Sequence, residues 1–80
     1  MYVKGFCILL LNERLRECRS RKGLTQTQVA AAVDISLRSY KYYESGEQAP
    51  SIKALAALAD FFGVSIDYLV GRTDRHDVNR

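Results

Sequence analysis

The residues best suited to recognising a ligand stand close together in the segment DISLRSYKYYESGE, at positions 34–47. Arg38 carries a planar fork of N–H donors that can bond two acceptors at once, such as O6 and N7 of guanine. Leu37 can pack against the methyl group of thymine, and Lys41 and Tyr42, one helical turn further on, can reach a base or a phosphate. Side chains of these types on one helix suit contact with base edges in the major groove of DNA.

On a helix, this segment presents two faces of different chemistry. The outer face carries residues 37, 38, 41, 42 and 45, and the opposite face carries residues 40, 43, 44 and 47. We expect the rings of Tyr40 and Tyr43 to fill the core, because their face continues from Ile35. A leucine and a tyrosine beside two cations on the outer face favour a binding surface, and an ordinary solvated helix face is the alternative.

Capping residues and glycines divide the chain into helices. Leu11, Leu15 and Cys18 recur at helical spacing, and Gly23 ends that helix after residue 22. Further helices can be capped by Thr25, Ser36, Ser51 and Ser65. We therefore expect helices over residues 11–22, 25–33, 36–44 and 51–62, and a fifth helix of one to two turns from Ser65. After residue 11, no segment alternates as a strand would.

The second and third of these helices are joined by a short turn, which is the helix-turn-helix geometry. In the second helix, the expected buried positions are Val29, Ala30 and Val33. The fourth helix has a wide apolar face that ends before Gly63, formed by Ile52, Leu55, Leu58, Ala59 and Phe62. These faces are sufficient for a small helical bundle.

The composition is that of one small domain. Eighty residues, 48% of them hydrophobic, can form a single core. Cys7 and Cys18 stand far apart without a histidine cluster, so we expect neither a zinc site nor a disulfide framework. The net charge of +3 arises in residues 1–53, which hold nine Lys/Arg and five Asp/Glu. A polyanionic partner is compatible with this distribution.

The two ends of the chain differ from residues 11–71, which we take as the helix-turn-helix domain. The apolar run GFCILLL, residues 5–11, is too short to span a membrane, and no small-residue cleavage site of a secretory signal follows it. We expect residues 1–10 to form a short strand or to lengthen the first helix, and residues 72–80 to be a polar, frayed tail. A cytoplasmic protein is expected.

Short motifs follow one another in a fixed order between Leu11 and Gly71. They are LTQ with an alanine four residues after the glutamine, then IS, YESG, PS and GVSIDYL. In order and spacing they resemble the phage-repressor, Cro-like (XRE-type) helix-turn-helix family. The resemblance implies an all-α, five-helix, lambda-repressor-like bundle with residues 36–44 as the recognition helix.

The resemblance also implies roles for individual residues. The expected base-reading residues are Leu37, Arg38, Ser39, Lys41 and Tyr42. By the same match, Gln26 is a phosphate anchor. The free backbone N–H groups and the positive dipole end at the start of the second helix also favour a phosphate oxygen beside Gln26 and Thr27. With Thr25, Ser45 and Lys53, these are the expected phosphate-contacting residues. The resemblance further implies an ion pair between Arg19 and Glu44 that orients the recognition helix. A partly buried carboxylate without its cation would be costly, which agrees with this pairing.

Three positions depart from the family pattern. The family usually has glycine where Asp34 stands, because the turn after the second helix tends to need a left-handed residue, and aspartate adopts that conformation at some cost. At position 37 a polar residue is commoner than leucine, and at position 40 a small branched residue is commoner than tyrosine. The last two differences bear on which DNA sequence is read.

These observations favour a sequence-specific transcription regulator that binds double-stranded DNA, and a repressor is favoured over an activator. The alternative is a protein-interaction module of antitoxin-like or regulatory-partner type. One helix in one groove gives little contact, so we expect a homodimer on a pseudo-palindromic operator. Residues 1–10, or the last helix with Tyr68, Leu69 and Val70, are the candidate dimer surfaces. No catalytic arrangement or glycine-rich phosphate loop is visible, so we expect no enzyme activity, metal, cofactor, small-molecule ligand or membrane partner.

Overall fold

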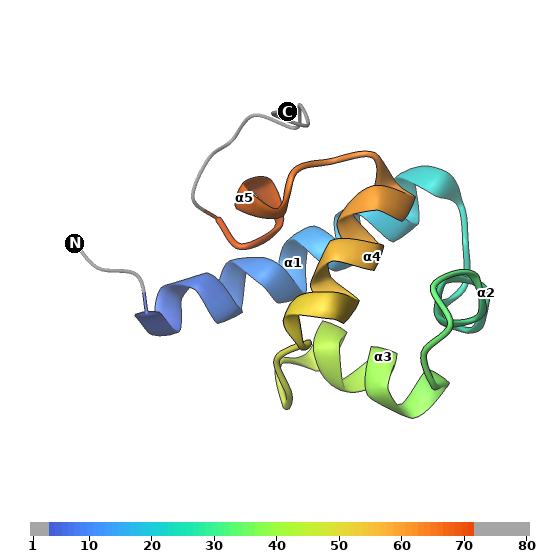
Figure 1. The fold of residues 1–80 in the computed structure, drawn as a ribbon, viewed down its shortest axis with the longest axis horizontal. Helices are drawn as coiled ribbons and strands as arrows, with labels where there is room; N and C mark the ends of the chain where they lie inside the picture. The colour runs from blue at the N-terminus through green and yellow to red at the C-terminus, as the bar shows by residue number, and fades with distance from the viewer. Residues whose placement is uncertain (1–3, 72–80) are drawn as a thin grey trace.

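The computed structural model describes residues 4–71, with side chains from Leu10 onward, and over this range the chain is a bundle of five helices without a strand (Figure 1). The helices are α1 (Lys4–Lys22), α2 (Gln26–Ala32), α3 (Leu37–Ser45), α4 (Ile52–Phe62) and α5 (Ile66–Leu69). The predicted all-α class is therefore confirmed for the described residues. The predicted frayed tail, residues 72–80, lies outside them.

Each of the four later helices begins where a side-chain oxygen caps it. Hydrogen bonds from the backbone N–H three residues further on are accepted by the hydroxyls of Thr25, Ser36, Ser51 and Ser65. Thr25 forms a full capping box, because the side chain of Gln28 accepts in return from the backbone N–H of Thr25 at 2.8 Å. One such cap stabilises a helix by about 1 kcal/mol. The predicted helix starts follow from this local chemistry.

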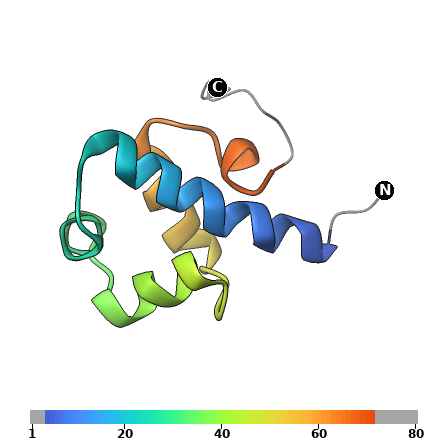
Figure 2. The same ribbon diagram turned by 180° about the vertical axis from the view of Figure 1, so that it is seen from behind.

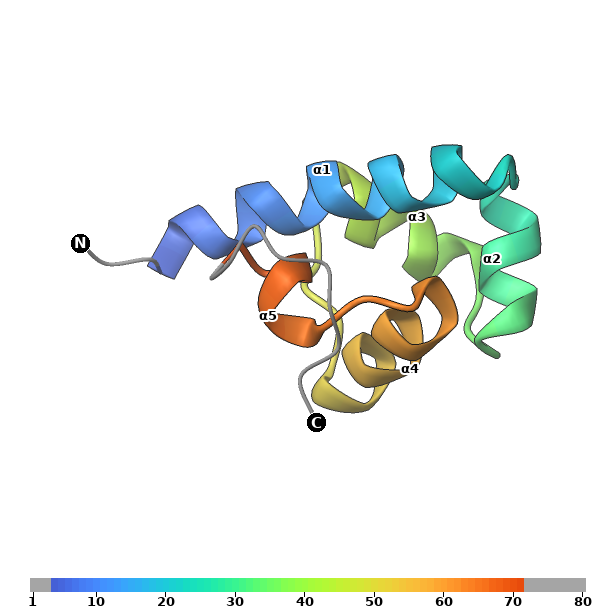
Figure 3. The ribbon, with the colours of Figure 1, turned by 90° about the horizontal axis from the view of Figure 1, so that it is seen from above.

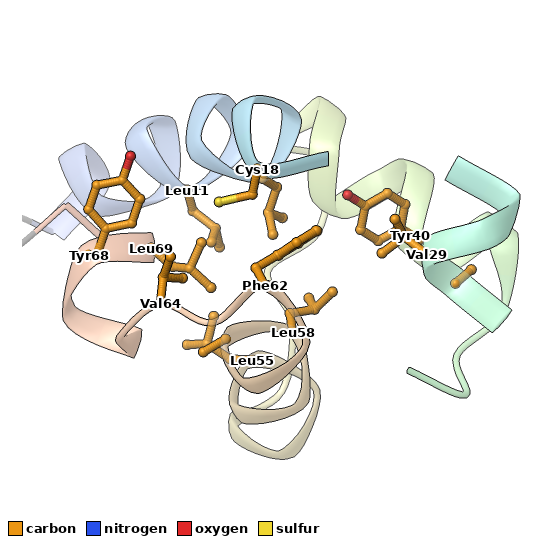
Figure 4. Close-up of a cluster of buried hydrophobic side chains, with 13 residues drawn as sticks. Leu11, Cys18, Val29, Tyr40, Leu55, Leu58, Phe62, Val64, Tyr68 and Leu69 are labelled. Carbon is orange, nitrogen blue, oxygen red and sulfur yellow. The ribbon is translucent and has the colours of Figure 1, made fainter. Parts of the chain in front are cut away.

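α1 runs the length of the molecule along one side of the core (Figures 2 and 3). α4 and α5 face it from the other side, and buried side chains of the three helices meet between them (Figure 4). Leu15, Leu58 and Leu69 have no exposed surface, and Val29 and Tyr40 extend the same core toward α2 and α3. Burying one leucine contributes about 1.5–3 kcal/mol. This core forms the platform on which α2 and α3 rest.

Ile52 does not lie where the sequence predicts. It was assigned to the buried face of the fourth helix, but 79% of its surface is exposed. Ile52 is the first residue of α4, and its neighbours Ser51 and Lys53 are also exposed, so only the very start of the helix lies outside the core. The buried stripe of α4 begins instead at Ala54.

Other expectations also need correction. Tyr68 and Leu69, assigned to one candidate dimer surface, are 4% and 0% exposed, because they complete the core against α1. They cannot form a surface between two subunits. Val33, predicted to be buried, is half-buried at the end of α2, and α3 continues one residue beyond its predicted end to Ser45.

The backbone of residues 4–10 continues α1 as a helix, where the sequence left a strand and a longer helix open. Leu10 of α1 packs against Gly71, where a β-carbon would clash with Cδ1 of Leu10. Gly71 also has a φ of 88°, so glycine meets both the steric and the backbone requirement there. None of the described helices combines the length and the apolarity needed to cross a membrane.

The turn between α2 and α3 holds its left-handed residue at Asp34, whose φ of 59° is the only positive value of a non-glycine residue in the described part of the chain. The side chain of Asp34 is exposed. Across the turn, the backbone N–H of Ile35 donates to the carbonyl oxygen of Ala30 at 3.0 Å. A left-handed conformation costs a non-glycine residue roughly 1–2 kcal/mol. Because aspartate stands where the family usually has glycine, the backbone of Asp34 is strained in this turn.

Asp34→Gly is expected to raise the free energy of unfolding by about 0.5–1 kcal/mol, because the relief of strain exceeds the extra entropy of glycine in the unfolded chain. Urea denaturation at neutral pH measures this difference. Asp34→Asn is the control, since asparagine tolerates the same conformation, and it should stay within about 0.5 kcal/mol of the wild type. A glycine variant without any gain would show that the aspartate side chain itself stabilises the turn.

Candidate nucleic-acid interface

α2, the connecting residues 33–36 and α3 form the helix-turn-helix (Figure 1). Ser36 starts α3, and Gly46 ends it in a left-handed conformation with φ of 87°. One face of α3 is buried through Tyr40 and Glu44. On the opposite face, Arg38 and Lys41 are exposed to solvent.

The outer face of α3 gathers four side chains around a shallow hollow of about 340 Å³, lined by Leu37, Arg38, Lys41 and Tyr42. Arg38 and Lys41 are exposed, and Leu37 and Tyr42 are half-buried. The Nε of Arg38 donates a hydrogen bond to the hydroxyl of Tyr42 at 3.3 Å, and its guanidinium lies 5.6 Å from the centre of the tyrosine ring. Four of the five predicted base-reading residues thus form one continuous surface.

On the inner face of α3, the side chain of Glu44 is almost fully buried, with 3% of its surface exposed. Arg19 of α1 binds its carboxylate twice, from Nε to Oε2 at 2.7 Å and from Nη2 to Oε1 at 3.2 Å. The hydroxyl of Tyr40, one turn earlier in α3, donates to Oε2, and the amide of Gln26 in α2 donates to Oε1 at 3.1 Å. One carboxylate therefore ties three helices together.

The partners of Glu44 fix its charge. Burial alone would raise the pKa of Glu44, but the hydrogen bonds from Arg19, Tyr40 and Gln26 outweigh burial and hold its pKa below the ordinary value of 4.5. The hydrogen bond to Glu44 raises the pKa of Arg19, and burial together with the bond to Glu44 raises the pKa of Tyr40. At neutral pH the network therefore consists of a carboxylate, a guanidinium and a neutral phenol.

Two backbone contacts from α1 hold the ends of the motif. The Nη1 of Arg16 donates to the carbonyl oxygen of Glu44 at 2.6 Å. Carbonyl groups in the last turn of a helix lack helical partners, and a cation is favourable there. The Nη1 of Arg19 donates to the carbonyl oxygen of Leu24 at 3.1 Å, just before α2. Both arginines thus position α2 and α3 relative to α1.

The structure brings the predicted partners Arg19 and Glu44 together, but sequence analysis missed the rest of the network. Tyr40 and Glu44 are four residues apart, a spacing at which side chains on a helix meet, so their hydrogen bond could have been predicted. The contact of Gln26 could not, because it depends on how α2 packs against α3. Arg16 was missed for the same reason.

Three of the predicted phosphate-contacting residues lie at the start of α2. Thr25 and Thr27 are exposed, and the hydroxyl of Thr25 accepts from the backbone N–H of Gln28 at 3.1 Å as the helix cap. Gln26 is half-buried and directs its amide at Glu44. An amide nitrogen has two N–H groups, so one remains for a further acceptor.

The remaining predicted DNA-contacting residues, Ser39, Ser45 and Lys53, differ in their surroundings. The hydroxyl of Ser39 accepts from the hydroxyl of Ser36 at 3.0 Å, and the hydroxyl of Ser45 donates to the carbonyl oxygen of Tyr42 at 3.1 Å. Both serines are therefore engaged within α3 and its cap. Lys53 is exposed on α4, separate from the hollow on α3.

Metal and thiol chemistry can be assessed for the side chains of residues 10–71. Among these, no three Asp, Glu, His or Cys side chains gather where they could hold a metal ion. Cys18 is 4% exposed, and burial raises the pKa of its thiol, so it stays protonated and unreactive at neutral pH. The outer face of α3 and the start of α2 are the candidate site.

Comparisons with known proteins give matches over most of the chain. The helix-turn-helix family model matches residues 15–69. The chain is 47% identical over 62 residues to the cryptic phage CTXphi transcriptional repressor RstR of Vibrio cholerae, covering 78% of this chain and 55% of that protein. It is 38% identical to the SPbeta prophage-derived uncharacterized HTH-type transcriptional regulator YonR of Bacillus subtilis, with 80% of this chain and 59% of that protein covered.

A third relative is the HTH-type transcriptional regulator AnsR of Bacillus subtilis, 42% identical over 60 residues, with 75% of this chain and 52% of that protein covered. The chain thus spans little more than half the length of these relatives. No solved structure matches it.

Arg19→Met is expected to lower the free energy of unfolding at pH 7 by about 3 kcal/mol, because it leaves the carboxylate of Glu44 buried without its cation. This decrease in the free energy of unfolding is at the low end of the range for breaking a buried ion pair, since 22% of the Arg19 side chain is exposed. Thermal or urea denaturation measures it. Arg21→Met, on an exposed position of the same helix, is the matched control and should change stability by less than about 0.5 kcal/mol.

The deficit of Arg19→Met should shrink in acid. The pKa of Glu44 is lowered on folding, so its carboxylate stabilises the wild type above the ordinary pKa of 4.5, and this contribution is lost as the pH falls through the lowered value. In the variant, protonation of Glu44 instead removes an unpaired buried charge. A deficit that stays constant from pH 7 to pH 3 would contradict this role of Glu44.

Proposed function

We propose that this chain, which belongs to the helix-turn-helix family, binds double-stranded DNA sequence-specifically in the cytoplasm and regulates transcription as a repressor. The observation that carries the proposal is the outer face of α3, where two exposed cations stand beside half-buried apolar side chains. The opposite face of the same helix is held by the Glu44 network. The names of the relatives, which are those of a repressor and of transcription regulators, support the same function.

In this proposal α3 lies in the major groove, which admits one helix and presents a different pattern of donors, acceptors and methyl groups for each base pair. Arg38 bonds O6 and N7 of a guanine, and Lys41 reaches a neighbouring base or phosphate. Leu37 and Tyr42 contribute apolar contact. Affinity is favoured because α3 is fixed on the bundle before it meets DNA, so little conformational freedom is lost on binding.

Phosphate contacts set the register of α3 in the groove. Gln26 is the central one in this proposal, because it can donate one amide N–H to a phosphate oxygen while the other stays on Glu44. Thr25 and Thr27 flank it on the same exposed turn, and Lys53 contributes a cation from α4. The contact to the DNA backbone and the orientation of the reading helix then depend on the same residue.

Binding as a homodimer completes the proposal. A single recognition helix covers few base pairs, whereas two related helices about 34 Å apart contact successive major grooves of a pseudo-palindromic operator. Two surfaces suit the contact between subunits. One is Ile66 of α5, which is 39% exposed, and the other is the N-terminal end of α1, which projects beyond the rest of the bundle (Figure 1).

A salt titration separates DNA binding from the protein-partner alternative. Affinity for random duplex DNA is expected to fall at least about tenfold between 50 and 200 mM salt, the loss for two or more neutralised phosphates. Fluorescence anisotropy of a labelled duplex measures it. Absence of binding at low salt, or binding that is independent of salt, would contradict the proposal.

Arg38→Ala is expected to weaken binding to the preferred operator by about 1–3 kcal/mol and to relax the preference at one base pair of each half-site. Selection from a pool of random duplexes, carried out for wild type and variant, reports the preference at each base pair. Fluorescence anisotropy on the preferred operator measures the loss of affinity. Arg21→Ala removes the same charge from α1 and is the control, whose selected sequence should match that of the wild type. An unchanged preference in Arg38→Ala would exclude Arg38 from base reading.

A further inference from the structure

The hollow on the outer face of α3 is bounded by two pairs of side chains, each four residues apart along the helix. All four side chains line it, and the helical spacing places Leu37 beside Lys41 and Arg38 beside Tyr42. Leu37 and Tyr42 are half-buried, so their carbon surfaces are held in place, while the aliphatic stem of Lys41 can line the hollow with its ammonium group in water. The hollow therefore combines apolar walls with one guanidinium at its edge.

Arg38 is held so that its outer edge is free. Its Nε is bonded to the hydroxyl of Tyr42 at 3.3 Å, whereas no side chain or carbonyl in the described part of the chain accepts a hydrogen bond from either of its Nη atoms. These two atoms form the fork that matches O6 and N7 of a guanine. Tyr42 thus restricts a long side chain that would otherwise lose rotamer freedom on binding.

We infer that α3 reads a guanine together with a neighbouring pyrimidine that carries a C5 methyl group, either thymine or 5-methylcytosine. Arg38 bonds the guanine, and the hollow between Leu37 and Tyr42 receives the methyl group beside it. Tyr42 acts as the positioning residue of Arg38. The inference rests on the proposed function and names the base step that the same site recognises.

The chemistry of the groove supports this assignment. The C5 methyl group of thymine projects into the major groove, where cytosine has only a hydrogen at the same position. A methyl group that enters the hollow is removed from water by carbon atoms on both sides, which is favourable. Methylation of a cytosine at this position therefore strengthens binding, since 5-methylcytosine presents the same group as thymine.

The test replaces single thymines by deoxyuridine, which removes the methyl group and leaves base pairing intact. The duplex is the operator selected with the wild-type protein, and the substitution is made at each thymine beside the guanine whose preference depends on Arg38. Affinity is expected to fall about fourfold at one such position, the effect of one buried methyl group. In a second duplex that carries a C·G pair at that position, replacing the cytosine by 5-methylcytosine should raise affinity by a similar factor.

Variants locate the effect in the hollow. Leu37→Ala should abolish the difference between thymine and uracil. Ile52→Ala is the matched control, because Ile52 is also an apolar first residue of a helix after a serine cap and is 79% exposed. Tyr42→Phe keeps the ring and removes the hydroxyl, so it should reduce the preference for guanine and retain the preference for the methyl group. A residue that only stabilised the fold would change neither preference.

The outcomes separate the inference from the proposed function. Equal affinity for thymine and uracil beside the guanine, with sequence-specific binding intact, overturns the inference alone, and so does a methyl preference that persists in Leu37→Ala. Failure to select any preferred duplex removes the proposed function and the inference with it. If Leu37→Ala does not fold by circular dichroism, the thymine and uracil comparison with the wild-type protein still decides.

Discussion

The buried carboxylate of Glu44 is the constraint on which the arrangement of the helix-turn-helix depends. A carboxylate removed from water costs several kcal/mol unless its charge and its lone pairs are satisfied. α1 supplies the cation of Arg19, α2 the amide of Gln26 and α3 the phenol of Tyr40. Any shift of α3 against α1 or α2 breaks at least one of these bonds. α3 therefore has one orientation on the bundle.

The two faces of α3 use the same helical spacing for different purposes. On the inner face, Tyr40 bonds Glu44 and becomes part of the core. On the outer face, Arg38 bonds Tyr42, four residues later, and remains in solvent with its donor fork free. The inner pair fixes where the helix lies, and the outer pair fixes how its guanidinium is presented. In the proposed function, rigidity on one side thus serves recognition on the other.

Local chemistry made most of the fold predictable from the sequence. The caps at Thr25 and Ser36 and the left-handed turn at Asp34 depend on neighbours in the chain, and each lies where it was predicted. Packing between helices that are distant in the sequence could not be predicted from the sequence in this way. Ile52 has the spacing of a buried residue and is exposed because it is the first residue of α4 and precedes the buried part of that helix. The contact of Gln26 with Glu44 depends on how two helices pack, and the DNA contacts of α3 stay a prediction.

Replacement of single guanines by 7-deazaguanine tests most directly whether the outer face of α3 reads the major groove, because it removes the N7 acceptor and keeps Watson–Crick pairing. With the operator selected by the wild-type protein, the account predicts one guanine in each half-site at which 7-deazaguanine weakens wild-type binding and leaves binding by Arg38→Ala unchanged. Wild-type binding that tolerates 7-deazaguanine at every position, or a loss of equal size in the variant, would contradict the account.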